Sequence, residues 1–192
     1  MVAASHIPIS TALVRPDQTG PDRLLAAWAA SQLHGSPVIV VDLGTATTVD
    51  AIDEDGFFLG GDILPGLALA ADSLAEGTAR LPRIDLALPE EAIGSETRTA
   101  IASGVVIGHI GAVRELAMRM HARIGSSSTG APTKVIITGG HTSAPWARAA
   151  WRTEAGPGLP AIADTLDPDL VLRGLGLLAE RMAGRPAAGA SR

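Results

Sequence analysis

Residues 38–53 read VIVVDLGTATTVDAID and contain the clearest secondary-structure signal in the chain. The run from Val38 to Val41 is apolar and unbroken, which is typical of a buried strand, and Asp42 follows where a loop opens. A second strand is predicted over residues 47–53. The turn residues at 54–56 precede two phenylalanines, so we expect an antiparallel hairpin here.

Helices are predicted on both sides of this hairpin. Apolar residues at helical spacing indicate a first helix that begins near Asp22 and stops at Gly35. The remaining predictions, in chain order, are a glycine-proline loop over 60–66, a helix over 67–79, a long and largely buried helix over 97–123 at the centre of the domain, a polar loop over 126–132, a buried strand over 135–137 and a final helix over 170–182.

The length and composition indicate one globular domain with irregular ends. At 192 residues and 46% hydrophobic content, the chain can bury a single core. Residues 1–19 are turn-rich and are predicted to form an extended lead-in to a folded lobe over residues 20–182. Residues 183–192 are predicted to form a flexible tail.

The same composition argues against several classes of protein. The absence of cysteine excludes disulfides, thiolate metal sites and a cysteine nucleophile. A net charge of -5 with only 3% aromatic residues argues against nucleic-acid binding. Because the first residues lack a secretory pattern and the longest weakly polar stretch, residues 98–114, is too short to cross a bilayer, we expect a cytoplasmic protein with no membrane partner.

The segment from Asp42 to Thr48 is the strongest candidate for chemistry. It places a carboxylate, a glycine and several hydroxyls directly after a buried strand. Glycine lets backbone amides turn toward a polyphosphate, and a carboxylate can hold a hard cation through oxygen. The alternative is a plain hairpin in which Asp42 only hydrogen-bonds the turn.

Gly20-Pro21-Asp22-Arg23 sets a carboxylate beside a guanidinium at a predicted helix start. Asp22 could serve as a general base, and Arg23 could bind a substrate carboxylate or phosphate through two hydrogen bonds. Considered alone, the motif is more typical of a helix cap with a neighbouring arginine.

Three further glycine-rich turns could contact an oxygen-rich ligand, and each has a structural alternative. They are residues 60–66, the turn at 93–97 before the long helix, and Thr138-Gly139-Gly140 after a strand. At the second turn, Ser95 or Thr97 as a plain N-cap is the commoner explanation. Walker A, dinucleotide-binding and nucleophile-elbow motifs do not occur, and the five histidines lack metal-ligand spacing, which leaves a kinase of another fold.

In order along the chain, five motifs resemble the second half of the type III pantothenate kinase family: GPDR, VVDLGTATTVD, GGDILPG, IGSETRTAIASG and VIITGG. The resemblance implies an α/β, ribonuclease-H-like lobe of the acetate kinase/actin-like superfamily, with a mixed sheet and flanking helices. It also implies ATP-dependent phosphorylation of pantothenate, the first step of coenzyme A biosynthesis.

The resemblance implies roles for single residues as well. The residues implied to contact pantothenate are Gly20, Pro21, Asp22, Arg23 and Thr97, with Asp22 as the catalytic base. Those implied to contact ATP are Gly44, Thr45, Gly139 and Gly140, and Asp42 is implied to bind a monovalent cation, K⁺ or NH₄⁺. Mg²⁺ is implied to accompany ATP.

Members of this family also carry an N-terminal lobe with an Asp-x-Gly-Asn-Thr phosphate loop, and no such segment precedes Gly20. We therefore expect one subunit of a split kinase, present as a homodimer or as a hetero-oligomer with a subunit that supplies the phosphate-loop lobe. One alternative is a non-catalytic binding or regulatory subunit. Another is a protein that binds or phosphorylates a different pantothenate-like alcohol.

Overall fold

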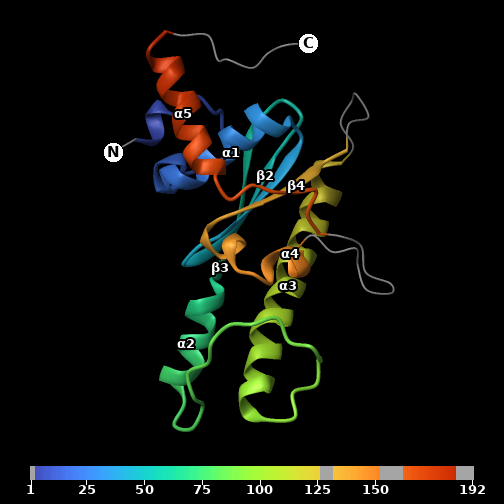
Figure 1. Ribbon diagram of the computed structural model, residues 1–192. Helices are drawn as coiled ribbons and strands as arrows, with labels where there is room; N and C mark the ends of the chain where they lie inside the picture. The colour runs from blue at the N-terminus through green and yellow to red at the C-terminus, as the bar shows by residue number, and fades with distance from the viewer. Residues whose placement is uncertain (1–2, 126–131, 152–161, 185–192) are drawn as a thin grey trace.

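The computed structural model describes residues 3–125, 132–151 and 162–184, and a five-stranded mixed sheet lies at its centre (Figure 1). The strand order is β3-β2-β1-β4-β5. The strands are β1 (Val38–Leu43), β2 (Ala46–Ile52), β3 (Phe58–Pro65), β4 (Lys134–Thr138) and β5 (Thr165–Leu166). Most of the predicted loop at 126–132 and of the predicted tail lies outside the described residues.

The sheet joins an antiparallel half to a parallel half at β1. β1 pairs antiparallel with β2, and β2 with β3, whereas β4 runs parallel to both β1 and β5. The predicted strands at 38–41, 47–53 and 135–137 are confirmed, as is the hairpin after residue 53. The hairpin turn is closed by Asp53, whose Oδ1 accepts hydrogen bonds from the amides of Asp55 and Phe57.

Alternate residues of β1 face two separate hydrophobic cores, because successive side chains of a strand point to opposite faces. Val38 and Val40 pack under α1 (Pro21–His34) and α5 (Leu170–Met182). Ile39, Val41 and Leu43 pack on the opposite face. That face is covered by α2 (Leu67–Gly77), α3 (Thr97–Ile124) and α4 (Ala147–Trp151). By this alternation the side chain of Asp42 lies on the face of the sheet that α1 covers.

The predicted loop at residues 60–66 is wrong, because Gly60, Gly61 and Pro65 lie within strand β3. Proline is tolerated because β3 is an edge strand and Pro65 is its last residue. Gly61 is required by a close approach: a Cβ there would collide with the Val49 carbonyl and with Oδ1 of Asp50. Glycine inside a strand often marks a site where another backbone approaches closely.

The long helix is present as α3, but its predicted position at the centre of the domain is wrong. Its second half packs along the sheet, while its first half projects beyond the sheet together with α2 and residues 78–96 (Figure 1). We call this projecting region, residues 67–108, the arm. Of the 28 residues of α3 only eight are buried, so the apolar spacing reports one covered side of a helix that is otherwise exposed.

α3 is also the one helix among the described residues whose length and apolar composition would suffice to cross a membrane. Core helices of soluble proteins pass the same test, and here Val106 and Val113 are fully buried in the hydrophobic core that α3 shares with α2, α4 and one face of the sheet.

The N-terminal residues 3–19, predicted as an extended lead-in, are mostly exposed and contact edge strand β3 through a bridge between Thr11 and Phe58. Two short 3₁₀ turns, Ala4–His6 and Pro16–Gln18, interrupt the segment. Ile7 is 5% exposed in the α1-side core, and the backbone of Ser10 and Ala12 hydrogen-bonds both polar groups of Phe58.

Candidate active site

The candidate site lies at the carboxyl ends of the parallel strands β1 and β4. Asp42 and Thr138 are opposite each other in the register there, and each is followed by a glycine-containing turn. In open α/β sheets, ligands bind preferentially outside the carboxyl ends of the strands. The arm borders the same end of the sheet, because α2 begins directly after the last residue of β3 (Figure 1).

The first turn of α1 brings Asp22 and Arg23 to this end. Gly20 is the N-cap and Pro21 occupies the first helical position, which suits proline because no amide hydrogen is needed there. No side chain caps the helix, so the capping interpretation of Asp22 is wrong. Asp22 is exposed, and Gly20 leaves room for its Oδ1, which a Cβ at that position would displace.

Arg23 forms a buried ion pair with Asp50, a residue that the sequence-based prediction did not single out. Its Nε donates to both carboxylate oxygens at 3.2 Å, and its Nη2 donates to Oδ1 at 2.5 Å. The side chain of Asp50 is only 2% exposed and that of Arg23 16%. Thr48 adds a hydroxyl donor to Oδ2 at 3.1 Å. A charged residue inside an apolar strand was the signal that could have identified Asp50.

The ion pair limits what Arg23 can do for a substrate. Its Nε and Nη2 are directed at Asp50, and its guanidinium carbon lies 5.8 Å from the centre of the Phe58 ring. Burial raises the pKa of Asp50, whereas the hydrogen bonds and charge of Arg23 lower it. Arg23 is therefore chiefly the counter-charge of Asp50, and a second role toward a substrate would fall to Nη1.

Asp42 is the uncompensated acid of the site. Burial raises the pKa of its carboxyl, and the negative charges of Asp22 and Asp50 raise it further. Among the described residues, no hydrogen bond or ion pair to the Asp42 carboxylate is found. The alternative in which Asp42 merely hydrogen-bonds its turn is therefore not supported: the turn is closed by Gly44, whose amide donates to the Ala46 carbonyl at 3.2 Å.

A partly buried carboxylate with no partner fits the expected monovalent cation. Among the described residues, no three His, Asp or Glu side chains gather as a metal site. A cation at Asp42 would therefore take its remaining ligands from backbone carbonyls, water and bound substrate, a set that hard cations accept.

The glycine turns around Asp42 pack closely against one another. Gly139 has φ +97°, and a Cβ there would collide with Oδ1 of Asp42 and lie 2.5 Å from the Leu43 nitrogen. Gly66 donates its amide to the Thr45 carbonyl at 3.0 Å, and a Cβ there would collide with the carbonyls of both Gly44 and Thr45. The side chain of Thr45 remains exposed. The predicted ATP-contacting turns at 44–45 and 139–140 thus lie on either side of Asp42.

Thr97 is the one predicted site residue that the fold sets apart from the others. It is exposed in the first turn of α3, twelve residues before His109, which contacts Thr47 beside the site. Twelve helical residues span about 18 Å. The N-cap alternative for Ser95 or Thr97 is wrong, because Glu96 is the N-cap and forms a capping box with Thr99.

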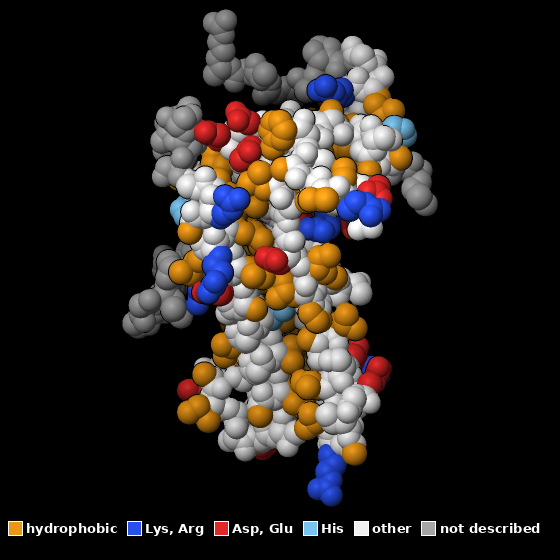
Figure 2. Space-filling view, turned by 180° about the vertical axis from the view of Figure 1, so that it is seen from behind, with side chains coloured by type: hydrophobic (Ala, Val, Ile, Leu, Met, Phe, Trp, Pro, Cys, Tyr) orange, Lys and Arg blue, Asp and Glu red, His pale blue; other side chains and the backbone are white. Residues whose placement is uncertain are grey.

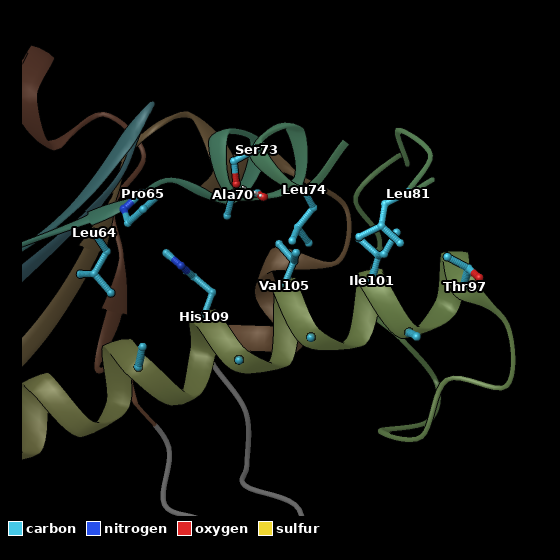
Figure 3. A pocket seen from close by; sticks show the side chains of 14 residues that line it. Leu64, Pro65, Ala70, Ser73, Leu74, Leu81, Thr97, Ile101, Val105 and His109 are labelled. Atoms are coloured by element: carbon cyan, nitrogen blue, oxygen red, sulfur yellow. Dashed lines mark hydrogen bonds between the residues drawn. The ribbon is translucent and has the colours of Figure 1, made fainter. Parts of the chain in front are cut away.

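An apolar groove of about 750 Å³ runs along the arm between α2 and α3 (Figure 3). Thr97 lies at one end of it, and His109, Leu64 and Pro65 lie at the other. Gly104 and Gly108 form part of its floor, and a Cβ at either glycine would meet open space. On the face shown in Figure 2, hydrophobic side chains run down the middle of the arm.

Comparisons with known proteins agree on one family. A family model described as type III pantothenate kinase matches residues 1–119. Type III pantothenate kinases from Rhodospirillum rubrum and from Dehalococcoides mccartyi strain 195 are 40% and 39% identical to this chain, over 90% and 85% of its length. The aligned regions are 61% and 57% of those relatives, so the chain spans little more than half the length of the curated relatives it matches.

A solved structure has the same fold. A protein from Campylobacter jejuni, described as a Baf family transcriptional activator, superposes with a TM-score of 0.61 at 22% identity. The superposition covers 94% of this chain and 72% of that one. At this identity the likeness concerns the fold and extends to nothing else.

Proposed function

The chain belongs to the type III pantothenate kinase family, and from this premise we propose that it is the substrate-side lobe of an ATP-dependent kinase that phosphorylates pantothenate. The observation that carries the proposal is the set of carboxylates at the end of β1. Asp22 is exposed, and Asp50 is neutralised by Arg23. Asp42 is half-buried, and within the described ranges neither Asp22 nor Asp42 has a hydrogen-bond or ion-pair partner. Phosphoryl transfer needs such a division of duties between a base and a cation-binding acid.

In the proposed reaction, Asp22 accepts the proton of the primary hydroxyl of pantothenate. The hydroxyl oxygen forms a bond to the γ-phosphorus of ATP, the bond from that phosphorus to the β–γ bridging oxygen breaks, and ADP leaves with that electron pair. Asp22 suits this role because it is exposed at a helix start, with Gly20 leaving space beside its carboxylate. The remaining pantothenate contacts would come from Gly20, Pro21 and Arg23.

ATP would lie against the turns on either side of Asp42. Gly44 and Thr45 form one turn and Gly139 and Gly140 the other, and both leave backbone close to the Asp42 carboxylate. Asp42 would hold K⁺ or NH₄⁺, which supplies positive charge near the phosphates. Mg²⁺ would enter with ATP, held mainly by phosphate oxygens and water.

The fold supports assignment to the ribonuclease-H-like lobes of the acetate kinase/actin-like superfamily. Three antiparallel strands followed by two parallel ones, with helices on both faces, agree with that expectation. In such kinases two lobes face a cleft. We propose that the carboxyl ends of β1 and β4 face a phosphate-loop lobe across such a cleft, and that the assembly works in the cytoplasm.

The arm supports a homodimer. Thr97 lies about 18 Å along α3 from the residues near Asp42, too far to contact a substrate held at Asp22 of the same chain. Thr97 lies at one end of the apolar groove, and a second copy packed there would cover the apolar residues that line it. We therefore assign Thr97 to the pantothenate site of a neighbouring copy.

The test is ATP-dependent formation of phosphopantothenate with Mg²⁺ and K⁺, by the purified chain alone and together with any protein that co-purifies with it. Activity that requires the co-purifying protein supports a split kinase. In the active preparation, Asp22→Asn should lower kcat at least about a thousandfold, with ATP affinity nearly unchanged. Absence of turnover in both preparations would contradict the proposal and favour a non-catalytic binding subunit.

A further inference from the structure

His109 is a buried polar side chain that the proposed chemistry does not use. It lies in the middle of α3 and is 8% exposed. Burial lowers the pKa of its imidazole, and the nearby His141 lowers it further, so the ring is neutral at physiological pH. Trp151, which is fully buried, contacts the ring edge-on, with the ring centres 6.4 Å apart and the planes at 88°.

The ring is joined to the site by one hydrogen bond. Its Nε2 lies 3.0 Å from Oγ1 of Thr47, whose side chain is 1% exposed. Of the side-chain hydrogen bonds between described residues, this is the one that connects α3 to the sheet. Because the side chain of Thr47 is buried, loss of the His109 ring would leave the Thr47 hydroxyl unsatisfied.

Thr47 is the β2 residue that follows the turn after Asp42. It is opposite Leu43 in the β1–β2 register, so Leu43 and Thr47 flank the turn. The Leu43 carbonyl is contacted by Nδ1 of His141 at 3.2 Å. His141 therefore contacts one side of the turn through the Leu43 carbonyl, and His109 contacts the other side through the Thr47 hydroxyl.

The opposite side of His109 lines the groove of the arm. In Figure 3 its ring points from α3 toward Leu64 and Pro65, the last residues of β3. The residue after Pro65 is Gly66, whose amide holds the Thr45 carbonyl. His109 thus lies between the groove and two strand ends next to the turn, the end of β3 and the start of β2.

We propose that His109 is a positioning residue that holds the turn at residues 43–47 in the geometry that accepts nucleotide, acting through the hydroxyl of Thr47. The nucleotide part of this inference rests on the proposed kinase function. The positional part does not, because it concerns the conformation of the turn in the free protein.

The experiment is amide hydrogen exchange of the full chain, followed in peptides that cover residues 43–47. His109→Leu removes the polar ring, whereas His109→Gln retains a polar group near the position of Nε2. Exchange in the turn should be about tenfold faster in His109→Leu and in Thr47→Val, and close to the parent rate in His109→Gln. The exposed His121, on the same helix, supplies the control: His121→Leu should leave the turn unchanged.

A double-mutant cycle tests whether His109 acts through Thr47. If it does, the variant with both His109→Leu and Thr47→Val should exchange no faster than the more affected single variant. Additive effects, or unchanged exchange in Thr47→Val and His109→Leu, would overturn the proposal. If His109→Leu fails to fold, the comparison of Thr47→Val with Thr47→Ser decides, because serine retains the hydroxyl.

ATP affinity supplies the second measurement and separates the two proposals. In a preparation that binds ATP, His109→Leu should weaken ATP binding about fivefold to tenfold, and His109→Gln should restore it. Parent protein that binds no ATP contradicts the proposed function, while the exchange data still decide the role of His109. Altered exchange with unchanged ATP affinity would overturn the link to nucleotide.

Discussion

The sheet end around Asp42 is closely packed by the chain's own residues, whereas the arm leaves apolar side chains exposed. At the sheet end, glycines let carboxylates and main chain approach closely, and the partly buried Arg23 neutralises one of three acids. Along the arm, an apolar groove stays open, and Ile93 and Leu69 are 88% and 49% exposed. The first region is pre-organised by the chain itself, whereas the second has the character of a surface that another molecule completes.

The largest effect is expected from removing the counter-charge of Arg23. Asp50→Ala leaves a partly buried guanidinium without its partner and should lower the free energy of unfolding by about 3 kcal/mol in urea denaturation. Asp62→Ala is the matched control, because Asp62 is an exposed acid on the neighbouring strand, and it should change stability by less than about 0.5 kcal/mol. Equal effects of the two would mean that the sheet end is not pre-organised by this pair.

The next largest effect concerns the adjacent glycines 139 and 140. Gly139→Ala is strained by φ +97° and pushes a methyl group onto Asp42 and Leu43, so it should cost about 2 kcal/mol of stability. A Cβ at Gly140 meets open space, and Gly140→Ala should change the melting temperature little. A Gly139→Ala protein as stable as Gly140→Ala would show that the close approach around Asp42 is not required.

A smaller effect follows from the raised pKa of Asp42. Because its folded pKa lies above the ordinary value of 3.8, the folded protein binds more protons than the unfolded chain above that pH, and stability falls as pH rises through the folded pKa. Asp42→Asn should therefore stabilise the protein at pH 7 by less than about 1 kcal/mol after solvent screening, with the gain vanishing as pH approaches 3.8. Asp85→Asn, at an exposed loop position, is the control and should show no such gain.

The parent protein and Asp42→Asn also test whether Asp42 binds a monovalent cation. At constant ionic strength, exchanging a bulky organic cation for K⁺ should raise the melting temperature of the parent and leave that of Asp42→Asn unchanged. An equal response of both proteins to K⁺ would remove Asp42 as the ligand.

The smallest effect on folding, with a large effect on assembly, is expected in the arm. Gly104→Arg places a charge in the groove at a position where a Cβ meets open space, so stability should change by less than about 0.5 kcal/mol. Sedimentation should nevertheless show loss of the dimer that we propose. Gly111→Arg, on the same helix but away from the groove, should remain dimeric. Dissociation of both variants, or of neither, would contradict a dimer seated in the groove.

Several elements of this molecule were predictable because their conformation depends on residues that are close together in the sequence. The apolar run before Asp42 forms a buried strand, and Gly35 ends α1 with φ +86°. Other parts were misjudged because neighbours decide them. Gly60 and Gly61 look like loop residues until β2 lies beside them with Asp50, and the apolar spacing of α3 does not reveal which end of the helix the sheet covers.

The sequence by itself determined strands β1, β2 and β4, helices α1, α2, α3 and α5, and the family to which the chain belongs. Only the tertiary structure decided that Arg23 pairs with Asp50, that Asp42 has no partner in the part of the chain that the structure describes, and that Thr97 is set apart along the arm. The physical reason is that hydrogen bonding, burial and charge act through space: Arg23 and Asp50 are 27 residues apart, and His109 and Thr47 are 62 apart. Helical and strand periods report only neighbours along the chain, so they cannot specify such pairs.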